Sequence, residues 1–396
     1  MPKNISMPRN CNSDEIRVSV THSLSEIPAE DWDALGDSSY PFTRHAFLYG
    51  LEQHDCLEPF GWHPVYFQVH RDEDLIAAIP CYLKTNSYGE LVFDHAWVNA
   101  YHRSGLDYYP KMVSAIPYTP ATGPRFLIEH SLVPGEETRR GLRDLLCQAI
   151  QGFCSDNKLS SWHLLFADKS VLDGLAGQGL DLRSDVQFHW QNDGYRDFDD
   201  FLSRLSSRKR KNIRKERRNI DAGLEIRMQA GGELSESEWR RVFALYAGIY
   251  RRKYGTATLT PELFQHLGAA MPQQVLVALA RLGGEIVAAS LFFRSDTHLY
   301  GRVWGCDHYY HNLHFECCYY RGIDYCIAEG LQCFDPGAQG EHKLARGFLP
   351  TLTWSGHWIA HPQFREAISE FLSQERRYIR SYHDELLSHS PFRQTE

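Results

Sequence analysis

The sequence lacks the features that mark membrane and secreted proteins. Its 396 residues contain no uninterrupted apolar run of the roughly 18 residues that a membrane span needs, and MPKNISMPRNCNSDE at the N-terminus has no signal-peptide core. The ten cysteines include no C-x-x-C pair, so neither a zinc knuckle nor a dithiol redox motif is present. We therefore expect a soluble, cytoplasmic protein with reduced cysteines.

The motifs of common cofactor enzymes are also missing. No H-E-x-x-H occurs among the 20 histidines, and HFE at residues 314–316 lacks the downstream P-C-x-x-C of a zinc deaminase. The chain has no P-loop, no Rossmann G-x-G-x-x-G and no G-x-S-x-G elbow, which argues against ATP activation, hydride transfer and serine hydrolysis. We expect no catalytic metal and no cofactor.

The length and composition predict two domains. The chain is long for a single core, and its hydrophobic content of 43%, with 13% aromatic residues, is enough to fill two. The turn sequence Asn192-Asp193-Gly194 interrupts the pattern of elements. We therefore predict an N-terminal domain of residues 1–195 and a C-terminal domain of residues 196–396.

One arrangement of elements is used twice along the chain. IPAEDWDAL, around Trp32, and LSESEWRRVF, around Trp239, each suit the first turn of a helix. Each leads through a second helix to a predicted hairpin: VYFQVHR with LIAAIPCYL in the first half, and VLVALAR with EIVAASLFF in the second. The match predicts one supersecondary plan repeated in both halves.

The order of elements in each half is that of an acyltransferase domain of the GNAT type. We predict an α/β (α+β) fold with tandem GNAT-like domains, each a mixed, mostly antiparallel sheet flanked by helices. A GNAT enzyme that uses acyl-CoA holds its pyrophosphate with a Gly-rich R/Q-x-x-G-x-G/A loop, whose N–H groups point at the phosphates. Neither half contains that loop.

One segment is intensely basic although the chain has a net charge of -8. SSRKRKNIRKERRNI, residues 206–220, has eight Arg or Lys and one Glu. If residues 198–222 form a helix, its like-charged neighbours each cost about 0.2–0.5 kcal/mol, so we expect an anion such as a pyrophosphate or an RNA backbone to neutralise them. A solvated helix or a nuclear targeting run is the alternative. The predicted phosphate ligands are Arg208, Lys211, Arg214, Lys215 and Arg218.

Two further segments mix charged and aromatic residues with glycine and proline. In SYGELVFDHAW and the residues up to Arg125, Asp94 and His95 could take a proton from an amine nucleophile. On a strand these neighbours would point to opposite faces. A turn-capping Asp94 and a hydrogen-bonded core His95 are the alternative.

The second such segment is FDPGAQGEHKLARGFLPTLTWSGHW, residues 334–358. It presents an acid, an imidazole and two cations after a strand end, where active sites of α/β proteins concentrate. Lys343 or Arg346 could stabilise the oxyanion of a tetrahedral intermediate, and Glu341 or His342 could move protons. A surface loop with incidental charges is the alternative.

A strand and a helix upstream of this segment supply further candidate substrate-binding residues. In LYGRVWGC, alternate residues are expected on one face of a strand, and a carboxylate begins the helix that follows. These candidates are Tyr300, Arg302, Trp304 and Glu316.

Several motifs together resemble the FemAB-like group of predicted N-acyltransferases: SYGELVFDHAW, YYPKMVSAIPYTPATGPR, VQFHW, FDDFLSRLSSRKRKNIRKERR, LYGRVWGC, LHFECCYY and GAQGEHKLARGFLP. The resemblance covers about residues 16–392. It implies paired GNAT-like domains, similar to the Fem enzymes that move an aminoacyl group from tRNA to an amine. It also matches Lys343 to their oxyanion-stabilising lysine and the basic helix to their precursor or tRNA groove. The long coiled-coil insertion of the Fem enzymes is missing.

The sequence therefore predicts an N-acyltransferase in which an amine attacks an activated acyl ester. Aminoacyl-tRNA is the expected donor and a small-molecule or peptide amine the acceptor. An acyl-CoA donor held without the usual loop is the second hypothesis. A non-catalytic module that binds a nucleotide-linked glycan or RNA is the third.

Overall fold

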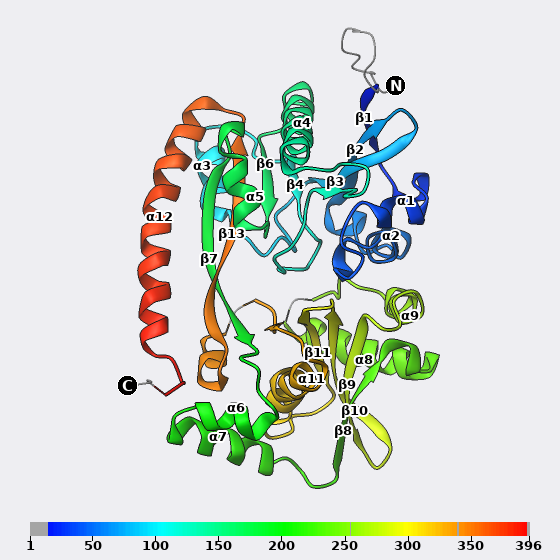
Figure 1. Ribbon diagram of the computed structural model, residues 1–396, viewed down its shortest axis with the longest axis vertical. Coiled ribbons are helices and arrows are strands. Elements are labelled where there is room, and N and C mark those ends of the chain that lie inside the picture. The colour runs from blue at the N-terminus through cyan, green and yellow to red at the C-terminus, as the bar shows by residue number, and fades with distance from the viewer. Residues whose placement is uncertain (1–14, 254, 339, 394–396) are drawn as a thin grey trace.

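The computed structural model describes residues 15–253, 255–338 and 340–393. The described strands form one large mixed sheet (Figure 1). In the first half, four antiparallel strands are followed by a fifth that is parallel to the fourth. They are β1 (Ile16–Thr21), β2 (Trp62–Arg71), β3 (Asp74–Lys84), β4 (Lys111–Ser114) and β6 (Ser161–Leu165), and the short β5 (Leu127–Ile128) pairs with β3.

The second half repeats this order. Four antiparallel strands are again followed by one that is parallel to the fourth. They are β8 (Leu224–Ala230), β9 (Val275–Leu282), β10 (Glu285–Arg294), β11 (His298–Cys306) and β12 (Cys333–Asp335). The predicted fold class and the plan used twice are both confirmed.

Each half gives its next strand to the other half. β7 (Asp181–Gln191) follows β6 along the chain but pairs with β12, whereas β13 (Leu349–Ile359) follows β12 but pairs with β6. The two strands also pair with each other and join the halves into one sheet, as Figure 1 shows. The boundary near residue 195 remains a prediction, since the sheet is continuous across it.

The helices follow the same repeat. α1 (Ala29–Ala34) and α2 (His45–Gln53) precede the first hairpin, as α8 (Glu236–Lys253) and α9 (Pro261–Ala270) precede the second. α4 (Glu136–Asp156) joins β4 to β6, and the helical segment that ends with α11 (Arg321–Glu329) joins β11 to β12. The remaining helices are α3 (His95–Arg103), α5 (Lys169–Gly174), α6 (Phe198–Arg204), α7 (Ser207–Arg218), α10 (Leu313–Phe315) and α12 (Pro362–Ser388).

One buried core is shared by the two halves. Phe42, which has no exposed surface, packs its ring 5.1 Å from those of Phe293 and Tyr300 in the other half. Full burial of a side chain of this size contributes about 1.5–3 kcal/mol. At the α2–α9 contact, a Cβ on Gly50 would lie 2.7 Å from His266, so the close approach of these helices needs glycine there. The shared core fixes the halves relative to each other.

The expected helix over residues 198–222 is wrong in one respect, because it is two helices, α6 and α7. Leu205 and Ser206 between them have extended backbone, and Leu205 is buried and forms a bridge with Phe392. Ser206 also donates its backbone N–H to Pro391. Pairing with the C-terminal segment therefore interrupts the helix. None of the described helices, α12 included, is long and apolar enough to cross a membrane.

Candidate active site between the two halves

A cavity of about 400 Å³, which we call the seam cavity, lies between the two halves beside β7, β12 and β13. Its volume is within the range of about 300–1,000 Å³ that small-molecule sites occupy. Residues from both halves line it, so the shared core and the exchanged strands determine its shape. Its polar and aromatic lining residues are Asp37, Tyr40, Thr122, Asp168, His189, Gln191, Ser295, Thr297, His298, Tyr300, Cys333, Asp335 and Thr351.

Asp335 is the most unusual of the lining residues. It ends β12 and is 2% exposed. One carboxylate oxygen, Oδ1, accepts the backbone N–H of Gly337 at 2.8 Å and lies 3.7 Å from His189 Nε2. The other, Oδ2, is buried without a hydrogen-bond partner among the described residues. A buried acceptor in this state costs about 1–3 kcal/mol, which a bound donor would offset.

Two histidines line the seam cavity close to this carboxylate. Burial lowers the pKa of His189 and of His298 below the ordinary value, although the charge of Asp335 opposes the shift in both. Both imidazoles are therefore neutral at pH 7. His298 stacks on Tyr300 with 5.8 Å between ring centroids, and one of its nitrogens lies 2.8 Å from the Thr297 hydroxyl. Each ring can exchange a proton with a bound ligand.

Lys343 lies next to Asp335, in the 3-10 helix η7 (Glu341–Arg346). It is 3% exposed, and its Nζ donates to the carbonyl of Gly337 at 2.5 Å and to that of Ala338 at 3.4 Å. Burial lowers its pKa to about 8, against the opposing charge of Asp335. Gly337 thus accepts from the lysine and donates to the aspartate. It has a positive φ of 89°, and a Cβ there would lie 3.1 Å from the Gly301 carbonyl.

Arg346 is tied to the basic helix. Its guanidinium lies 3.5 Å from the centroid of Phe315 and donates to Glu216 of α7 at 2.8 Å and to the carbonyl of His342 at 2.8 Å. Glu216 also accepts the hydroxyl of Tyr320. The single acid of the basic helix therefore connects α7 to the turn that carries Lys343.

The other two residues predicted in this turn are more exposed. His342 lies 2.9 Å from the Tyr319 hydroxyl, and burial together with the nearby cations lowers its pKa. Glu341 accepts the hydroxyl of Tyr382, on α12, at 2.6 Å. Neither residue lines the seam cavity, and neither does Lys343, which is linked to the lining residue Asp335 through Gly337. The proposed proton-transfer roles of His342 and Glu341 remain predictions.

The expectation that Tyr300, Arg302 and Trp304 share one strand face is wrong. The register of β10 with β11 shifts at Arg302, which forms a bulge, so Tyr300 packs in the core between the halves and Trp304 in the core of the second half. Arg302 donates to the backbone carbonyl of Tyr118, in the other half, at 2.7 Å. Of the three, Tyr300 lines the seam cavity.

Glu316 is held by protein cations. It is 2% exposed, accepts from Arg217 of α7 at 2.9 Å, and forms an ion pair with Arg321 at 2.9 Å. Arg217 also donates to Asp324 at 2.7 Å. These pairs dock α7 on the second half. A direct contact of Glu316 with substrate stays a prediction, and it requires one of these pairs to open.

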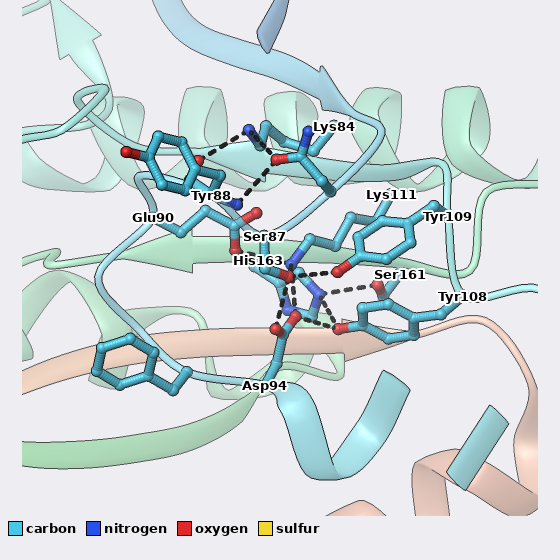
Figure 2. Close-up of polar contacts among 12 residues, drawn as sticks. Lys84, Ser87, Tyr88, Glu90, Asp94, Tyr108, Tyr109, Lys111, Ser161 and His163 are labelled. Carbon is cyan, nitrogen blue, oxygen red and sulfur yellow. Dashed lines mark hydrogen bonds and ion pairs between the residues drawn. The ribbon is translucent and has the colours of Figure 1, made fainter. Parts of the chain in front are cut away.

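Asp94 and His95 lie apart from the Lys343 turn, and they begin α3 instead of a strand. Asp94 is 4% exposed, and its Oδ2 accepts from Lys111 at 2.5 Å and from Tyr108 at 2.7 Å, as Figure 2 shows. Burial acts to raise the pKa of Asp94, but the Lys111 ammonium and hydrogen bonds bring it below its ordinary value. His95 is exposed and stacks on Phe93.

Asp94 belongs to a buried group of charges, which we call the Lys111 cluster: Lys84, Glu90, Asp94 and Lys111 (Figure 2). Lys111 also donates to Glu90 at 2.7 Å. Burial raises the pKa of Glu90 to about 7 and lowers that of Lys84 to about 7. The Lys84 ammonium lies 3.9 Å from the Trp62 ring centroid and donates to the Tyr88 carbonyl. Because one lysine faces two carboxylates, this cluster holds the loop before α3 in place.

The predicted phosphate ligands of α7 are all exposed. Arg214 pairs with Asp199 of α6 at 2.7 Å, a contact between two exposed side chains that contributes at most about 1 kcal/mol. Ile213 is buried and anchors the opposite face of the helix. The helix contacts η7, so the basic surface lies beside the turn that carries Lys343. The five cations are Arg208, Lys211, Arg214, Lys215 and Arg218.

Sequence reasoning overlooked Asp335, His189 and His298. Asp335 stands in the quoted segment FDPGAQ at a strand end, a position that favours functional residues, and this signal could have identified it. The two histidines stand on strands far away in sequence. Only the pairing of β7, β11 and β12 brings all three residues to one cavity.

A comparison with protein families now defines the class of the protein. The chain belongs to the FemAB-like family, described as peptidoglycan biosynthesis/recognition, whose model matches residues 23–394. This membership confirms the resemblance and supports a transferase of acyl or aminoacyl groups. A search of the curated proteins found no match.

Several solved structures are similar to the chain. FemX is 11% identical over 80% of this chain and 93% of its own, with a TM-score of 0.48. The C-terminal domain of a lysylphosphatidylglycerol synthetase from Agrobacterium fabrum is 11% identical over 86% and 95%, with a TM-score of 0.49. A tandem GNAT protein from the clavulanic acid biosynthesis pathway is 10% identical over 88% and 99%, with a TM-score of 0.45. These likenesses concern the fold alone.

Proposed function

We propose that the chain transfers an acyl group from an activated ester to an amine in the seam cavity. The observation that carries this proposal is the carboxylate of Asp335, which has one buried oxygen unpaired among the described residues and lies beside the buried Lys343. An amine or ammonium group of an acceptor supplies the N–H donor that this oxygen needs. The cavity is large enough for the reacting ends of two substrates.

The proposed reaction uses a base and a positive charge side by side. The amine nitrogen attacks the ester carbonyl carbon, and Asp335 accepts the proton that the nitrogen loses. Lys343 does not line the cavity, but its ammonium has three N–H donors and uses two of them on the Gly337 and Ala338 carbonyls, so we assign the third to the oxyanion. The ester C–O bond then breaks, the departing oxygen takes the proton, and the product is an amide.

Aminoacyl-tRNA is the donor that we propose. The exposed cations of α7 suit a phosphodiester backbone, and α7 is joined to the Lys343 turn by the ion pair of Glu216 with Arg346. The Gly-rich loop that holds acyl-CoA in GNAT enzymes is missing from both halves. Both features favour the tRNA donor over the second hypothesis, acyl-CoA.

The test is a transfer assay with labelled donors. Labelled aminoacyl-tRNA and labelled acyl-CoA are each incubated with the protein and a panel of amines, and the labelled amide is measured. Transfer from the tRNA donor alone supports the proposal. Transfer from acyl-CoA alone supports the second hypothesis, and binding without transfer from either donor supports a non-catalytic module.

The role of α7 is tested separately. Arg214→Glu with Lys215→Glu reverses two exposed charges, and we expect the affinity for tRNA to fall at least 10-fold and to depend less on salt. Arg227→Glu with Arg240→Glu reverses two exposed charges elsewhere on the second half and serves as the control. An equal loss in both variants would show that α7 has no special role.

A further inference from the structure

A second cavity, of about 530 Å³, lies between α5, β7, β13 and α12, and we call it the arginine cavity. It has one residue, Leu352, in common with the seam cavity. Four cations and one carboxylate line it, which gives a local net charge of 4 − 1 = +3 in a chain whose total is -8. Its charged residues are Lys169, Asp181, Arg376, Arg377 and Arg380.

Protein contacts hold two of these cations in place. Arg376 donates to the backbone carbonyl of Leu182, so its guanidinium is fixed beside β7. Lys169 pairs with Asp173, and its ammonium lies 4.9 Å from the centroid of the Trp354 ring on the cavity wall. The cavity therefore has a preformed positive wall beside an aromatic surface.

The other two cations have more freedom. Arg377 and Arg380 are exposed on one face of α12, and within the described part of the chain neither forms an ion pair with a carboxylate. Arg377 makes a long hydrogen bond, 3.4 Å, to the Ser373 hydroxyl. The carboxylate of Asp181 is already engaged, because it accepts the Ser369 hydroxyl at 2.7 Å. Asp173 and Asp181 neutralise part of the positive charge, whereas the three arginines have no carboxylate partner in the described part of the chain.

We propose that the arginine cavity binds a small ligand that carries a phosphate or diphosphate group. A guanidinium group can donate two parallel hydrogen bonds to the oxygens of one phosphate. Three arginines line this one cavity. The volume suits a small molecule held between two helices and two strands, whereas an RNA backbone needs an extended surface such as that of α7. Binding here does not depend on the acyl transfer proposed for the seam cavity.

The ligand also joins parts of the fold that are far apart in sequence. It contacts α12 together with β7 and β13, the two strands that the halves exchange. Figure 1 shows α12 running along these strands. Because a ligand that binds only the folded state stabilises it, the melting temperature of the protein rises with ligand concentration.

Calorimetric titration with inorganic diphosphate tests the proposal, with acetate as the non-phosphate anion. Native protein is expected to bind diphosphate and not acetate. The double variant Arg377→Ala with Arg380→Ala changes exposed side chains, so it is expected to fold normally and to lose at least 10-fold in affinity for diphosphate. Its melting temperature should no longer rise with diphosphate.

Two matched variants separate this site from the rest of the surface. Arg227→Ala with Arg240→Ala removes two exposed arginines elsewhere, and Arg214→Ala with Lys215→Ala removes two cations of α7. Both are expected to bind diphosphate as the native protein does. The proposal is overturned if the native protein does not bind diphosphate, or if the α7 variant loses diphosphate binding while the Arg377 and Arg380 variant keeps it. The proposal would also be overturned if the Arg377 and Arg380 variant lost tRNA binding but kept its affinity for diphosphate.

Discussion

Two buried lysines in this protein have opposite electrostatic environments. Lys111 has no exposed surface, and although burial acts to lower its pKa, the carboxylates of Glu90 and Asp94 raise the pKa above its ordinary value. Lys343 is 3% exposed and donates to backbone carbonyls, and burial lowers its pKa to about 8. Lys111 in the first half therefore stays protonated at neutral pH, whereas Lys343 in the second half has a pKa close enough to neutrality to lose its proton.

The role of a buried lysine depends on the groups that accept its hydrogen bonds. The carboxylate of Asp94, joined above about pH 7 by that of Glu90, compensates the lost hydration of the Lys111 ammonium, so we expect the Lys111 cluster to be structural. Carbonyl dipoles compensate it only partly, so Lys343 keeps a free donor and a pKa close to neutrality, which suits a residue that stabilises transient negative charge. Identical substitutions at the two positions should therefore have different effects.

The largest effect is expected from Lys111→Met. This change leaves the carboxylates of Glu90 and Asp94 buried without their common partner, and we expect the free energy of unfolding to fall by about 3–5 kcal/mol. Urea titration followed by circular dichroism measures it. Lys169→Met, at a lysine whose side chain is 39% exposed, is the control and should cost less than about 1 kcal/mol. If Lys111→Met and Lys169→Met lowered the free energy of unfolding equally, the two buried carboxylates would not depend on Lys111, and this account of the Lys111 cluster would be wrong.

Lys343→Met makes the same change at a lysine that has no ion pair with a carboxylate in the described part of the chain, so it can be compared directly with Lys111→Met. We expect turnover to fall about 10²–10³-fold, the cost of removing one oxyanion donor, with the substrate affinity and the unfolding free energy little changed. Steady-state kinetics with the donor identified by the transfer assay, together with urea titration, give all three quantities. A loss of stability as large as that of Lys111→Met would mean that Lys343 is structural too.

A smaller effect concerns Glu90, the carboxylate of the Lys111 cluster that titrates near neutrality. Burial raises its pKa to about 7, so the folded protein holds a proton there that the unfolded chain has released above a pKa near 4.5. The associated stability is complete below the unfolded pKa and is lost as the pH rises from there through about 7, an effect of about 3 kcal/mol. We expect Glu90→Gln to reduce this loss of stability between pH 5 and pH 8, as measured by urea titration. An unchanged pH dependence would contradict the buried, shifted carboxylate.

The sequence was a good guide to local structure. The two hairpins and the tryptophan-bearing helices follow from periodicity and turn residues. The segment GEHKLARG drew attention to Lys343 because its charges lie between glycines. These signals are local, since each depends on residues a few positions apart. The family match later supported the same overall plan.

Long-range pairing could not be derived in this way. The exchange of β7 and β13, and the meeting of Asp335 with His189 and His298, depend on contacts between residues that are far apart in the chain. Periodicity also suggested one continuous basic helix, whereas tertiary pairing of Leu205 divides it. Asp94 was chosen for its residue type, and its pairing with Lys111 could not be foreseen; its proton-transfer role remains a prediction.

The most direct test of the comparison is a titration of the lysine side chains by heteronuclear NMR. In native protein we expect two lysines with low midpoints, Lys84 near 7 and Lys343 near 8, while Lys111 stays protonated across the same range. Lys343→Met should remove the signal that titrates near 8 and leave the other. If every low midpoint remained in that variant, Lys343 would be an ordinary lysine and our account of the seam cavity would be wrong.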